Sequence, residues 1–413
     1  MSEIRDLSLA PSGEMKIAWV SKNMPVLTGI KAEFEKEKPF AGVKISLSIH
    51  LEAKTAYLCR TLAAGGAVMS VTGSNPLSTQ DDVAAALAAG GMDVYAWHAA
   101  TQEEYERHIS MALACGPDLV LDDGADLSEA LHTRDKSKAA NVLGACEETT
   151  TGVLRFKSRE RSGALAFPVI AVNDADCKHL FDNRYGTGQS VWDGIMRTTN
   201  LVVSGKHVVV AGYGWCGKGV ALRAKGLGAK VIVTEVDPVR AMEAAMDGYE
   251  VMTMDEAAPV GDIFVTVTGC CDVITGRHFK NMKNGAILSN AGHFDVEVNV
   301  AELKRMSSES YTARNNITAY KLDGKELYVL GEGRLVNLAA ADGHPAEIMD
   351  LSFAIQALSL KYLLSKKGQL EPKVYNVPEE IDKHVAKLKL KAMGIEIDTL
   401  TEEQYRYLFG GCV

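Results

Sequence analysis

The chain of 413 residues is long enough for two or three domains, and its 47% hydrophobic residues are sufficient for well-packed cores. A net charge of −9 provides no basic field for nucleic acid or an anionic membrane surface, and no apolar run approaches the ~20 residues of a membrane span. The N-terminal residues lack the order of a secretory signal, and the eight scattered cysteines indicate neither a disulfide framework nor a zinc site. We therefore expect a cytoplasmic protein with no nucleic-acid or membrane partner and no bound metal.

Short β-like runs alternate with helix-like segments over the first part of the chain, the pattern of a parallel α/β layer. The β-like runs lie at 43–49, 67–71, 92–96, 118–122 and 169–172, and the helix-like segments include 81–89 and 103–114. His50 follows the first run and Asp123 follows the fourth. Ligands of open α/β sheets gather at the carboxyl ends of strands, so both side chains are expected at a ligand site. Each alone has a structural alternative, such as an N-cap or a satisfied core histidine.

A second alternating set begins at Lys206, and its first turn carries a glycine-rich motif. Gly212, Gly214 and Gly217 follow an apolar run at 208–210, and the next run ends at Glu235. Glycines at this spacing permit a tight turn, close approach of the backbone to a pyrophosphate, and packing of the following helix. The carboxylate suits a ribose diol and would repel a 2′-phosphate. The motif predicts a dinucleotide site that favours NAD over NADP, with a purely structural turn as the alternative.

Further along, residues 346–364 carry apolar side chains at helical spacing, which predicts a long connecting helix, and the last forty residues are rich in Lys and Glu. We therefore expect an α/β protein with two doubly wound, Rossmann-like domains and a small C-terminal helical segment.

Taken together, the motifs resemble one family, the S-adenosylhomocysteine hydrolases, over nearly the whole chain. The resemblance is carried by stretches that include Ser78-Thr-Gln-Asp81, Leu121-Asp-Asp-Gly124, Glu147-Glu-Thr-Thr-Thr-Gly-Val153, Phe181-Asp-Asn183, Gly292-His-Phe-Asp-Val-Glu297 and Glu332-Gly-Arg-Leu-Val-Asn-Leu338. It implies a homotetrameric enzyme of S-adenosylmethionine recycling with a tightly held NAD. It also implies a substrate-binding domain of residues 1–182 and 341–372, an NAD-binding domain of 183–340, and a shortened oligomerisation segment of 373–413.

The reaction implied by the resemblance begins with oxidation of the ribose 3′-hydroxyl, which makes the C4′ proton acidic. Homocysteine can then be eliminated and water added before the ketone is reduced again. By the family's pattern, Lys178 removes the 3′-hydroxyl proton and Asp182 holds its ammonium. Burial and a bound nicotinium are expected to lower the pKa of this lysine.

Other positions match family residues around the substrate and the cofactor. Asp123, His50 and His293 match those that handle the C4′ proton, the leaving thiolate and the attacking water, and the steps are not apportioned among them. Glu148 would hold the 2′- and 3′-hydroxyls. The remaining matches around NAD or the substrate are Thr149, Thr150, Thr151, Asn183, Glu235, Asn337 and His344.

Two positions depart from the family's base-reading pattern. The chain has His50-Leu-Glu52-Ala-Lys54 where the usual family has His-x-Thr-x-Glu or Gln. Hypoxanthine offers an N1–H donor and an O6 acceptor, the reverse of adenine, so a carboxylate at 52 and an ammonium at 54 complement it. With adenine both side chains would be left unpaired, at a cost of about 1–3 kcal/mol each, so the pair could favour hypoxanthine over adenine about a hundredfold. We therefore predict S-inosylhomocysteine as the preferred substrate, as in an inosyl-specific branch of the family.

Several alternatives remain open. Glu52 and Lys54 could pair with each other at a helix start while backbone groups hold adenine, which would give an S-adenosylhomocysteine hydrolase. Asp342, grouped with His344 near the base, could support Lys54 or face solvent. A non-catalytic NAD-binding regulator and a conventional dehydrogenase are rival classes. Thr187 stands where many relatives have a Cys, and Trp215 and Cys216 are unusual in a glycine-rich loop.

Overall fold

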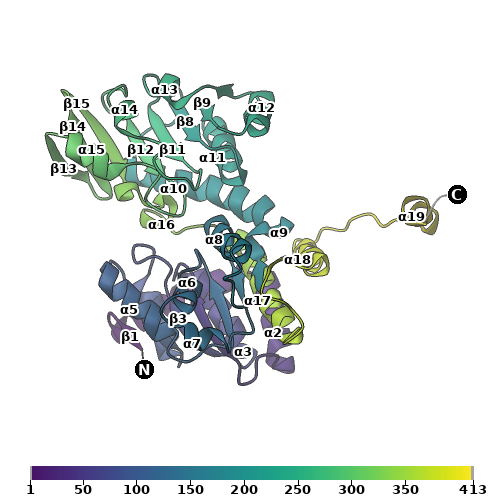
Figure 1. Ribbon diagram of the computed structural model, residues 1–413. Coiled ribbons are helices and arrows are strands. Elements are labelled where there is room, and N and C mark those ends of the chain that lie inside the picture. The colour runs from purple at the N-terminus through teal and green to yellow at the C-terminus, as the bar shows by residue number, and fades with distance from the viewer. Residues whose placement is uncertain (1, 411–413) are drawn as a thin grey trace.

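The protein, described here over residues 2–410 of a computed structural model, forms two lobes that are each built on an eight-stranded sheet (Figure 1). The first sheet is parallel throughout, in the order β1-β4-β3-β2-β5-β6-β7-β16. Its strands are β1 (Glu3–Ile4), β2 (Lys44–Ser48), β3 (Val68–Thr72), β4 (Asp93–Ala96), β5 (Leu119–Asp122), β6 (Gly144–Glu147), β7 (Val169–Ala171) and β16 (Val374–Asn376).

The second sheet has the order β10-β9-β8-β11-β12-β15-β14-β13, and among these described strands only the pairs of β14 with β13 and β15 are antiparallel. Its strands are β8 (His207–Ala211), β9 (Lys230–Thr234), β10 (Glu250–Val251), β11 (Ile263–Thr266), β12 (Ile287–Asn290), β13 (Glu309–Arg314), β14 (Ile317–Leu322) and β15 (Lys325–Leu330).

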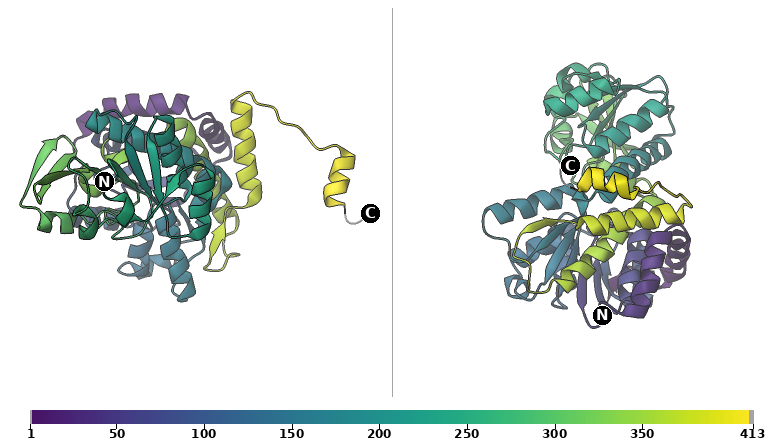
Figure 2. Two further views of the ribbon diagram at one scale, coloured as in Figure 1. Left: turned by 90° about the horizontal axis from the view of Figure 1, so that it is seen from above. Right: turned by 90° about the vertical axis from the view of Figure 1, so that its right-hand side faces the viewer.

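Helices cover both faces of each sheet (Figures 1 and 2). In the N-terminal half they are η1 (Leu7–Leu9), α1 (Ala10–Lys22), α2 (Pro25–Glu37), α3 (Ala53–Ala64), α4 (Asp81–Ala89), α5 (Gln102–Ala112), α6 (Asp126–His132), α7 (Lys136–Ala139), α8 (Thr150–Arg161), η2 (Val172–Asp174), α9 (Asp176–Lys178), the π-helix η3 (His179–Gly186) and α10 (Thr187–Thr199). The others are α11 (Trp215–Gly226), α12 (Pro238–Met246), α13 (Met254–Ala257), α14 (Gly276–Phe279), α15 (Val300–Met306), η4 (Gly331–Gly333), α16 (Val336–Ala339), α17 (Ala346–Ser365), α18 (Glu379–Ala392) and α19 (Glu402–Phe409).

Alternate residues of the central strands enter cores on opposite faces of each sheet. Leu119 and Leu121 of β5 join one apolar cluster while Val120 joins another, and Val208 and Val209 of β8 divide in the same way. Strands buried on both faces are apolar at nearly every position, which is why these strands are near-continuous apolar runs in the sequence. The predicted fold, two doubly wound Rossmann-like units, is confirmed.

The strand order places a topological switch point in each sheet. Chain connections reverse direction between β2 and β5 in the first sheet and between β8 and β11 in the second. Open α/β sheets bind ligands in the crevice outside the carboxyl ends of strands at such points. His50 and Asp123 follow β2 and β5, and Gly212 follows β8, so both switch points carry residues that the sequence singled out.

The chain returns from the second lobe to the first through α17, which confirms the predicted long helix at 346–364. This helix is long and apolar enough to cross a membrane by length and composition, but 67% of that window is buried in the fold. It packs against α2, α3 and β6. Beyond it, β16 pairs with β7 and therefore extends the first sheet with residues that the sequence assigned to the C-terminal segment. The segment that follows α18 and ends in α19 extends away from the body (Figure 2).

Candidate active site

A cavity of about 960 Å³ lies between the two lobes, at the carboxyl ends of both sheets. His50, Asp123 and Glu148 line it from the ends of β2, β5 and β6, and Gly212 and Glu235 line it from the ends of β8 and β9. The cavity therefore combines the switch points of both sheets in one space, large enough for a substrate and a cofactor together.

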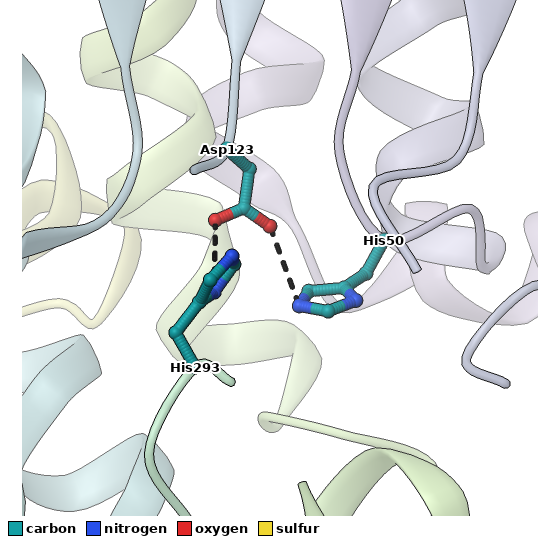
Figure 3. A group of neighbouring side chains, drawn as sticks. All are labelled: His50, Asp123 and His293. Atoms are coloured by element: carbon teal, nitrogen blue, oxygen red, sulfur yellow. Dashed lines mark ion pairs between the residues drawn. The ribbon is translucent and has the colours of Figure 1, made fainter. Parts of the chain in front are cut away.

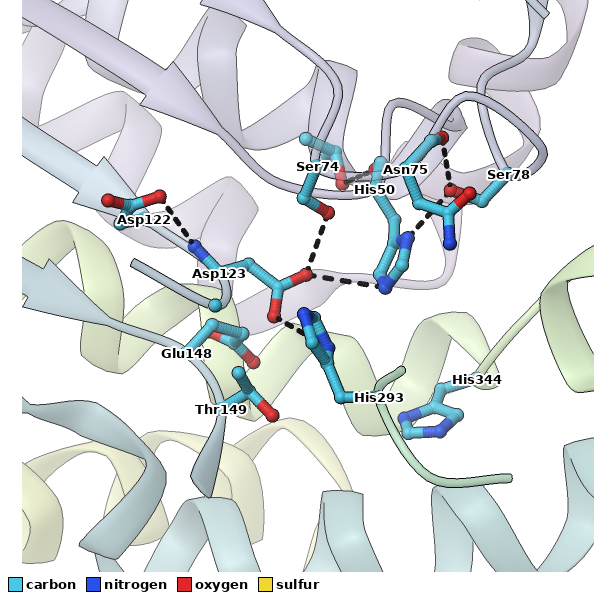
Figure 4. Close-up of polar contacts among 12 residues, drawn as sticks. His50, Ser74, Asn75, Ser78, Asp122, Asp123, Glu148, Thr149, His293 and His344 are labelled. Carbon is cyan, nitrogen blue, oxygen red and sulfur yellow. Dashed lines mark hydrogen bonds and ion pairs between the residues drawn. The ribbon is translucent and has the colours of Figure 1, made fainter. Parts of the chain in front are cut away.

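Asp123 forms the centre of a polar cluster in this cavity (Figure 3). Its Oδ2 lies 3.3 Å from His50 Nε2, and its Oδ1 lies 3.8 Å from His293 Nδ1. Ser74 donates a hydrogen bond of 3.0 Å from its Oγ to Asp123 Oδ2 (Figure 4). His50 and Asp123 come from the first lobe and His293 from the second, so the cluster spans the junction between the lobes.

His50 is held from both sides of its ring. Its Nδ1 lies 2.6 Å from Ser78 Oγ, while its Nε2 faces Asp123 (Figure 4). Burial lowers the pKa of His50 to about 4, against the opposing effect of the Asp123 carboxylate. The imidazole is therefore neutral at neutral pH and can accept a proton.

The same three side chains have a spacing that suits a metal ion. The ligand atoms of His50, Asp123 and His293 lie within 4.8 Å of one another. The sequence predicts no metal site, and that stays a prediction.

Lys178 forms the centre of a second cluster, at the start of the π-helix η3. Its Nζ donates to Asn183 Oδ1 at 2.7 Å and lies 3.4 Å from Asp182 Oδ2 and 3.5 Å from Glu148 Oε1. A π-helical turn places residues four and five positions apart on the same side, and it therefore brings Asp182 and Asn183 to Lys178. Such turns are rare and frequently occur at functional sites. Asp182 also accepts from Ser352 Oγ at 2.7 Å and contacts His344 Nδ1.

The charges of this second cluster are strongly coupled. Burial acts to lower the pKa of Lys178, but the Asp182 and Glu148 carboxylates outweigh it and hold the pKa above its usual value. The net direction is opposite to the expectation from burial, because the ammonium is buried beside two anions rather than alone. Burial acts to raise the pKa of Asp182, yet Lys178 and His344 hold it well below its usual range. Burial raises the pKa of Glu148 to about 7, with Lys178 opposing.

Glu52 and Lys54 lie together on the cavity wall and are buried. Glu52 is the N-cap residue of α3, and its carboxylate accepts from the backbone N–H groups of Lys54 and Thr55 at 3.0 and 3.4 Å. Lys54 Nζ donates to Glu52 Oε2 at 2.7 Å and to the backbone oxygen of Asp342 at 3.0 Å. The helix-start ion pair that the sequence offered as an alternative is therefore present in the structure.

Asp342 and His344 differ in what they present to the cavity. The Asp342 carboxylate is exposed to solvent and lies 3.7 Å from Arg197 Nη1, so only its backbone carbonyl supports Lys54. His344 lines the cavity, and its Nε2 lies 3.3 Å from Thr187 Oγ1. Of the two alternatives for the Asp342 side chain, the structure has the solvent-facing one.

The glycine-rich turn between β8 and α11 has the backbone geometry that a dinucleotide requires. Gly212 has a φ of +102°, which favours glycine, and a Cβ on Gly217 would lie 2.0 Å from the Gly212 carbonyl oxygen. Gly214 is the N-cap of α11 and offers no side chain to its N–H groups. These groups remain available to an anion, as a pyrophosphate requires. Glu235 Oε2 accepts from the backbone N–H of Tyr213 at 2.7 Å, which places the carboxylate beside the turn.

The remaining predicted cofactor residues also reach the cavity. Asn337 donates to Ser190 Oγ at 3.1 Å, while its own Oδ1 is buried without a hydrogen-bond partner. That free acceptor, the bare helix start and the glycine turn together fit NAD. The cavity-lining residues that match the predicted cofactor positions are Thr149, Thr150, Thr151, Asn183, Gly212, Gly214, Glu235 and Asn337.

Some polar neighbours of the site were not singled out by the sequence. Ser352 donates to Asp182, and Gln356 donates to Glu148 Oε2, from one face of α17. Both were overlooked because this helix was interpreted only as an apolar connection. Two polar residues four positions apart and buried in an apolar helix are the signal that could have identified them.

Comparison with known proteins gives family matches in both lobes. The family model described as S-adenosyl-L-homocysteine hydrolase matches residues 1–141, and its NAD binding domain matches residues 183–343. A protein of Methanocaldococcus jannaschii named S-inosyl-L-homocysteine hydrolase is 59% identical over 408 residues, 99% of this chain and 98% of that protein. A protein of Thermococcus kodakarensis named adenosylhomocysteinase is 58% identical over 406 residues, 98% of this chain and 96% of that protein.

Among solved structures, a dipicolinate synthase polypeptide of Bacillus halodurans has a similar fold, with a TM-score of 0.50 at 14% sequence identity over 79% of this chain and 99% of that one. The full-length identity to the two hydrolases is much more specific than this likeness of fold. The chain therefore belongs to the S-adenosyl-L-homocysteine hydrolase family, whose members are NAD-binding enzymes.

Proposed function

We propose that this enzyme reversibly hydrolyses S-inosyl-L-homocysteine to inosine and L-homocysteine, as a step of S-adenosylmethionine recycling. The observation that carries the proposal is the buried pair of Glu52 and Lys54 on the cavity wall, which sets a hydrogen-bond acceptor beside a donor. Relatives of nearly equal identity carry the inosyl and the adenosyl name, so the substrate is argued from these two side chains.

Both side chains retain capacity for a ligand although they contact each other. The Lys54 ammonium has three N–H donors, and two are engaged by Glu52 and by the Asp342 carbonyl. The third can donate to O6 of hypoxanthine. Glu52 Oε1 receives only the long 3.4 Å contact from Thr55, so it can accept from N1–H. Adenine would set its N1 acceptor against the carboxylate and its amino donor against the ammonium.

The second candidate is S-adenosyl-L-homocysteine, and the 2.7 Å contact between Lys54 and Glu52 favours it. In that function the two charges satisfy each other and only stabilise the start of α3. In the inosyl function, Glu52 and Lys54 form hydrogen bonds with the purine and set the preference for hypoxanthine. In the adenosyl function they do not contact the purine, so replacing them would leave the preference unchanged.

Lys178 and its neighbours are assigned to the chemistry at the ribose. When bound, NAD accepts a hydride from C3′ and returns it at the end of the same turnover. As a neutral amine, held in position by Asp182 and Asn183, Lys178 takes the proton of the 3′-hydroxyl. Asp182 and Glu148 stabilise its ammonium form, and the positive charge of a bound nicotinium would lower the pKa toward the neutral amine. Glu148 Oε1 is buried without a hydrogen-bond partner, which suits an acceptor for the 2′- and 3′-hydroxyls.

Asp123, His50 and His293 are assigned to the C4′ proton, the leaving thiolate and the attacking water. The neutral His50 can accept a proton at the nitrogen that faces Asp123, and Ser78 fixes the ring at the other nitrogen. His293 comes from the second lobe, so the group of three is complete only when both lobes contribute.

The substrate is tested in the direction of synthesis, with homocysteine and either inosine or adenosine. We expect kcat/KM for inosine to exceed that for adenosine by about a hundredfold, since two buried mismatches separate the bases. Equal rates, or a preference for adenosine, would refute the inosyl assignment and leave the family membership intact.

The class of enzyme is tested by the cofactor content of the purified protein. A hydrolase that recycles NAD within each turnover should carry about one NAD per chain through dialysis and show no net reduction of added NAD during turnover. A conventional dehydrogenase would need added NAD and reduce it, and a non-catalytic relative would bind NAD without turning over either nucleoside.

We further propose that the enzyme is a cytoplasmic homotetramer. Residues 393–409 of the described chain carry exposed apolar side chains on a segment that extends from the body, including Ile397, Tyr405, Leu408 and Phe409. Apolar side chains exposed on such an arm are typical of an interface in an oligomer. Light scattering on the purified holoenzyme should give four times the mass of the chain, and a monomer would refute the assembly.

A further inference from the structure

Trp215 is a large aromatic residue beside the glycine-rich turn. It is the first residue of α11, directly after the N-cap Gly214, and it lines the cavity at the glycine-rich turn. Its indole therefore stands beside the helix start that offers free N–H groups to the cofactor. No local pattern in the sequence accounts for a large aromatic residue here.

The indole is held by a stacked partner from a different segment. The rings of Trp215 and His179 have centroids 5.0 Å apart and planes inclined by 28°. His179 follows Lys178 directly and begins η3, and it lines the same cavity. The stack therefore joins the glycine-rich turn to the segment that carries the lysine assigned to the 3′-hydroxyl.

Lys218 adds a second contact to the indole. Its Nζ lies 4.4 Å from the centroid of the Trp215 ring and 2.6 Å from Glu243 Oε1. An ammonium group and the face of an indole ring attract each other, so Lys218, one turn further along α11, helps to hold the Trp215 ring in place.

The backbones beneath the stack are in direct contact. A Cβ on Gly219 of α11 would lie 1.7 Å from the backbone oxygen of Arg184 in η3, and a Cβ on Gly188 would lie 2.6 Å from the backbone oxygen of Gly219. This close backbone contact holds α11 against η3, the two elements from which the rings of Trp215 and His179 extend.

We propose that Trp215, stacked on His179, is a cofactor-retention residue that covers the bound NAD where it meets the start of α11. The rigid aromatic wall excludes water from the pyrophosphate and must move before the cofactor can leave. His179 positions the indole and acts through it. Aromatic stacking contributes about 0.5–1.5 kcal/mol, which corresponds to as much as about tenfold in a dissociation rate.

The test measures release of NAD from the purified holoenzyme, by trapping freed cofactor after dilution and quantifying what stays bound. We expect Trp215→Ala to release NAD about tenfold faster than the wild type and Trp215→Phe to stay within about threefold of it, because phenylalanine keeps an aromatic face. Trp19→Ala is the matched control, since this indole is 69% exposed on α1, and it should release NAD at the wild-type rate.

A double-variant cycle tests the role of His179. If His179 acts through the indole, the variant carrying both Trp215→Ala and His179→Ala should release NAD no faster than Trp215→Ala alone. Wild-type release from Trp215→Ala would overturn the proposal, and so would additive effects of the two substitutions.

A fluorescence measurement applies even where the alanine variant fails to fold. Filling the site with the reduced cofactor should quench tryptophan emission of the wild type, and Trp215→Phe should lose most of that quench while Trp19→Phe keeps it. An equal quench in Trp215→Phe and the wild type would place the indole away from the cofactor and overturn the proposal.

Discussion

The two sheets share one order of their central strands and open on the same cavity, yet they contribute to it in different ways. The first sheet places ionisable side chains after its strands, among them His50, Asp123 and Glu148. The second sheet contributes mainly backbone, through Gly212 and the bare start of α11. A site made of side chains is sensitive to a change of functional group, whereas a site made of backbone is sensitive to added atoms.

The largest effect is expected from removal of Lys178, the general base assigned to the 3′-hydroxyl. Lys178→Met should reduce turnover by at least about a thousandfold while the protein stays folded, because the amine that takes the 3′-hydroxyl proton is removed. The measurement is kcat with inosine and homocysteine, with circular dichroism as a check of fold. Lys157→Met, which removes a part-buried pair with Asp174, is the control and should change kcat little. More than a tenth of wild-type turnover in Lys178→Met would contradict the assignment.

The base-reading pair should change specificity rather than catalysis. Glu52→Thr combined with Lys54→Glu should move the ratio of kcat/KM toward adenosine by about a hundredfold, because both hydrogen-bond polarities are reversed. The ratio of the two nucleosides is measured for the double variant and for the wild type. An unchanged ratio would favour the structural ion pair, and with it the adenosyl alternative.

The backbone site is tested with two glycines of one helix. Gly217→Ala should destabilise the protein by about 1–3 kcal/mol and deplete bound NAD, because the added Cβ would lie 2.0 Å from the Gly212 carbonyl oxygen. Gly226→Ala, near the end of the same helix, meets nothing within 4 Å and should be neutral or stabilising. Thermal unfolding and NAD content are compared for the pair. Equal losses in both variants would show that the close approach of Gly217 to Gly212 does not decide the outcome.

Asp122, buried beneath the side-chain site, should make stability depend on pH. Burial raises the pKa of Asp122 to about 7, although the N–H of Ser128 opposes this. An acid whose folded-state pKa is raised holds its proton more tightly when folded, so its contribution to stability is present at low pH and falls as pH rises from about 4 to about 7. Asp122→Asn lacks this loss, so its stability relative to the wild type should rise across that range by at most ~1.4 kcal/mol per pH unit. A pH-independent difference in denaturant unfolding would refute the assignment.

The smallest effect is expected at Asp342. Asp342→Ala should change kcat/KM for inosine by less than about threefold, because the exposed carboxylate is lost while the carbonyl that accepts from Lys54 remains. A tenfold loss in the same assay would show that the carboxylate turns inward when substrate binds.

The sequence by itself determined the class of fold and the general place of the site. Short β-like runs such as 118–122, alternating with helix-like segments, predicted a parallel α/β layer, and the glycine spacing at 212, 214 and 217 predicted the cofactor turn. Both are local consequences of side-chain and backbone chemistry, which is why they could be recognised without a structure.

Only the tertiary structure decided the pKa values of the site residues and the side chains that contact them. The pKa of Lys178 moves upward because Glu148, directly after β6, and Asp182 from η3 converge on one ammonium, whereas the sequence led us to expect a lowered pKa from burial and a bound nicotinium. Ser352 and Gln356 reach the site from α17, more than 150 residues further along the chain than the groups they contact. The stack of Trp215 on His179 likewise joins two separate segments, α11 and η3. Contacts between distant segments depend on how helices and sheets pack, and this packing has no local signal in the sequence.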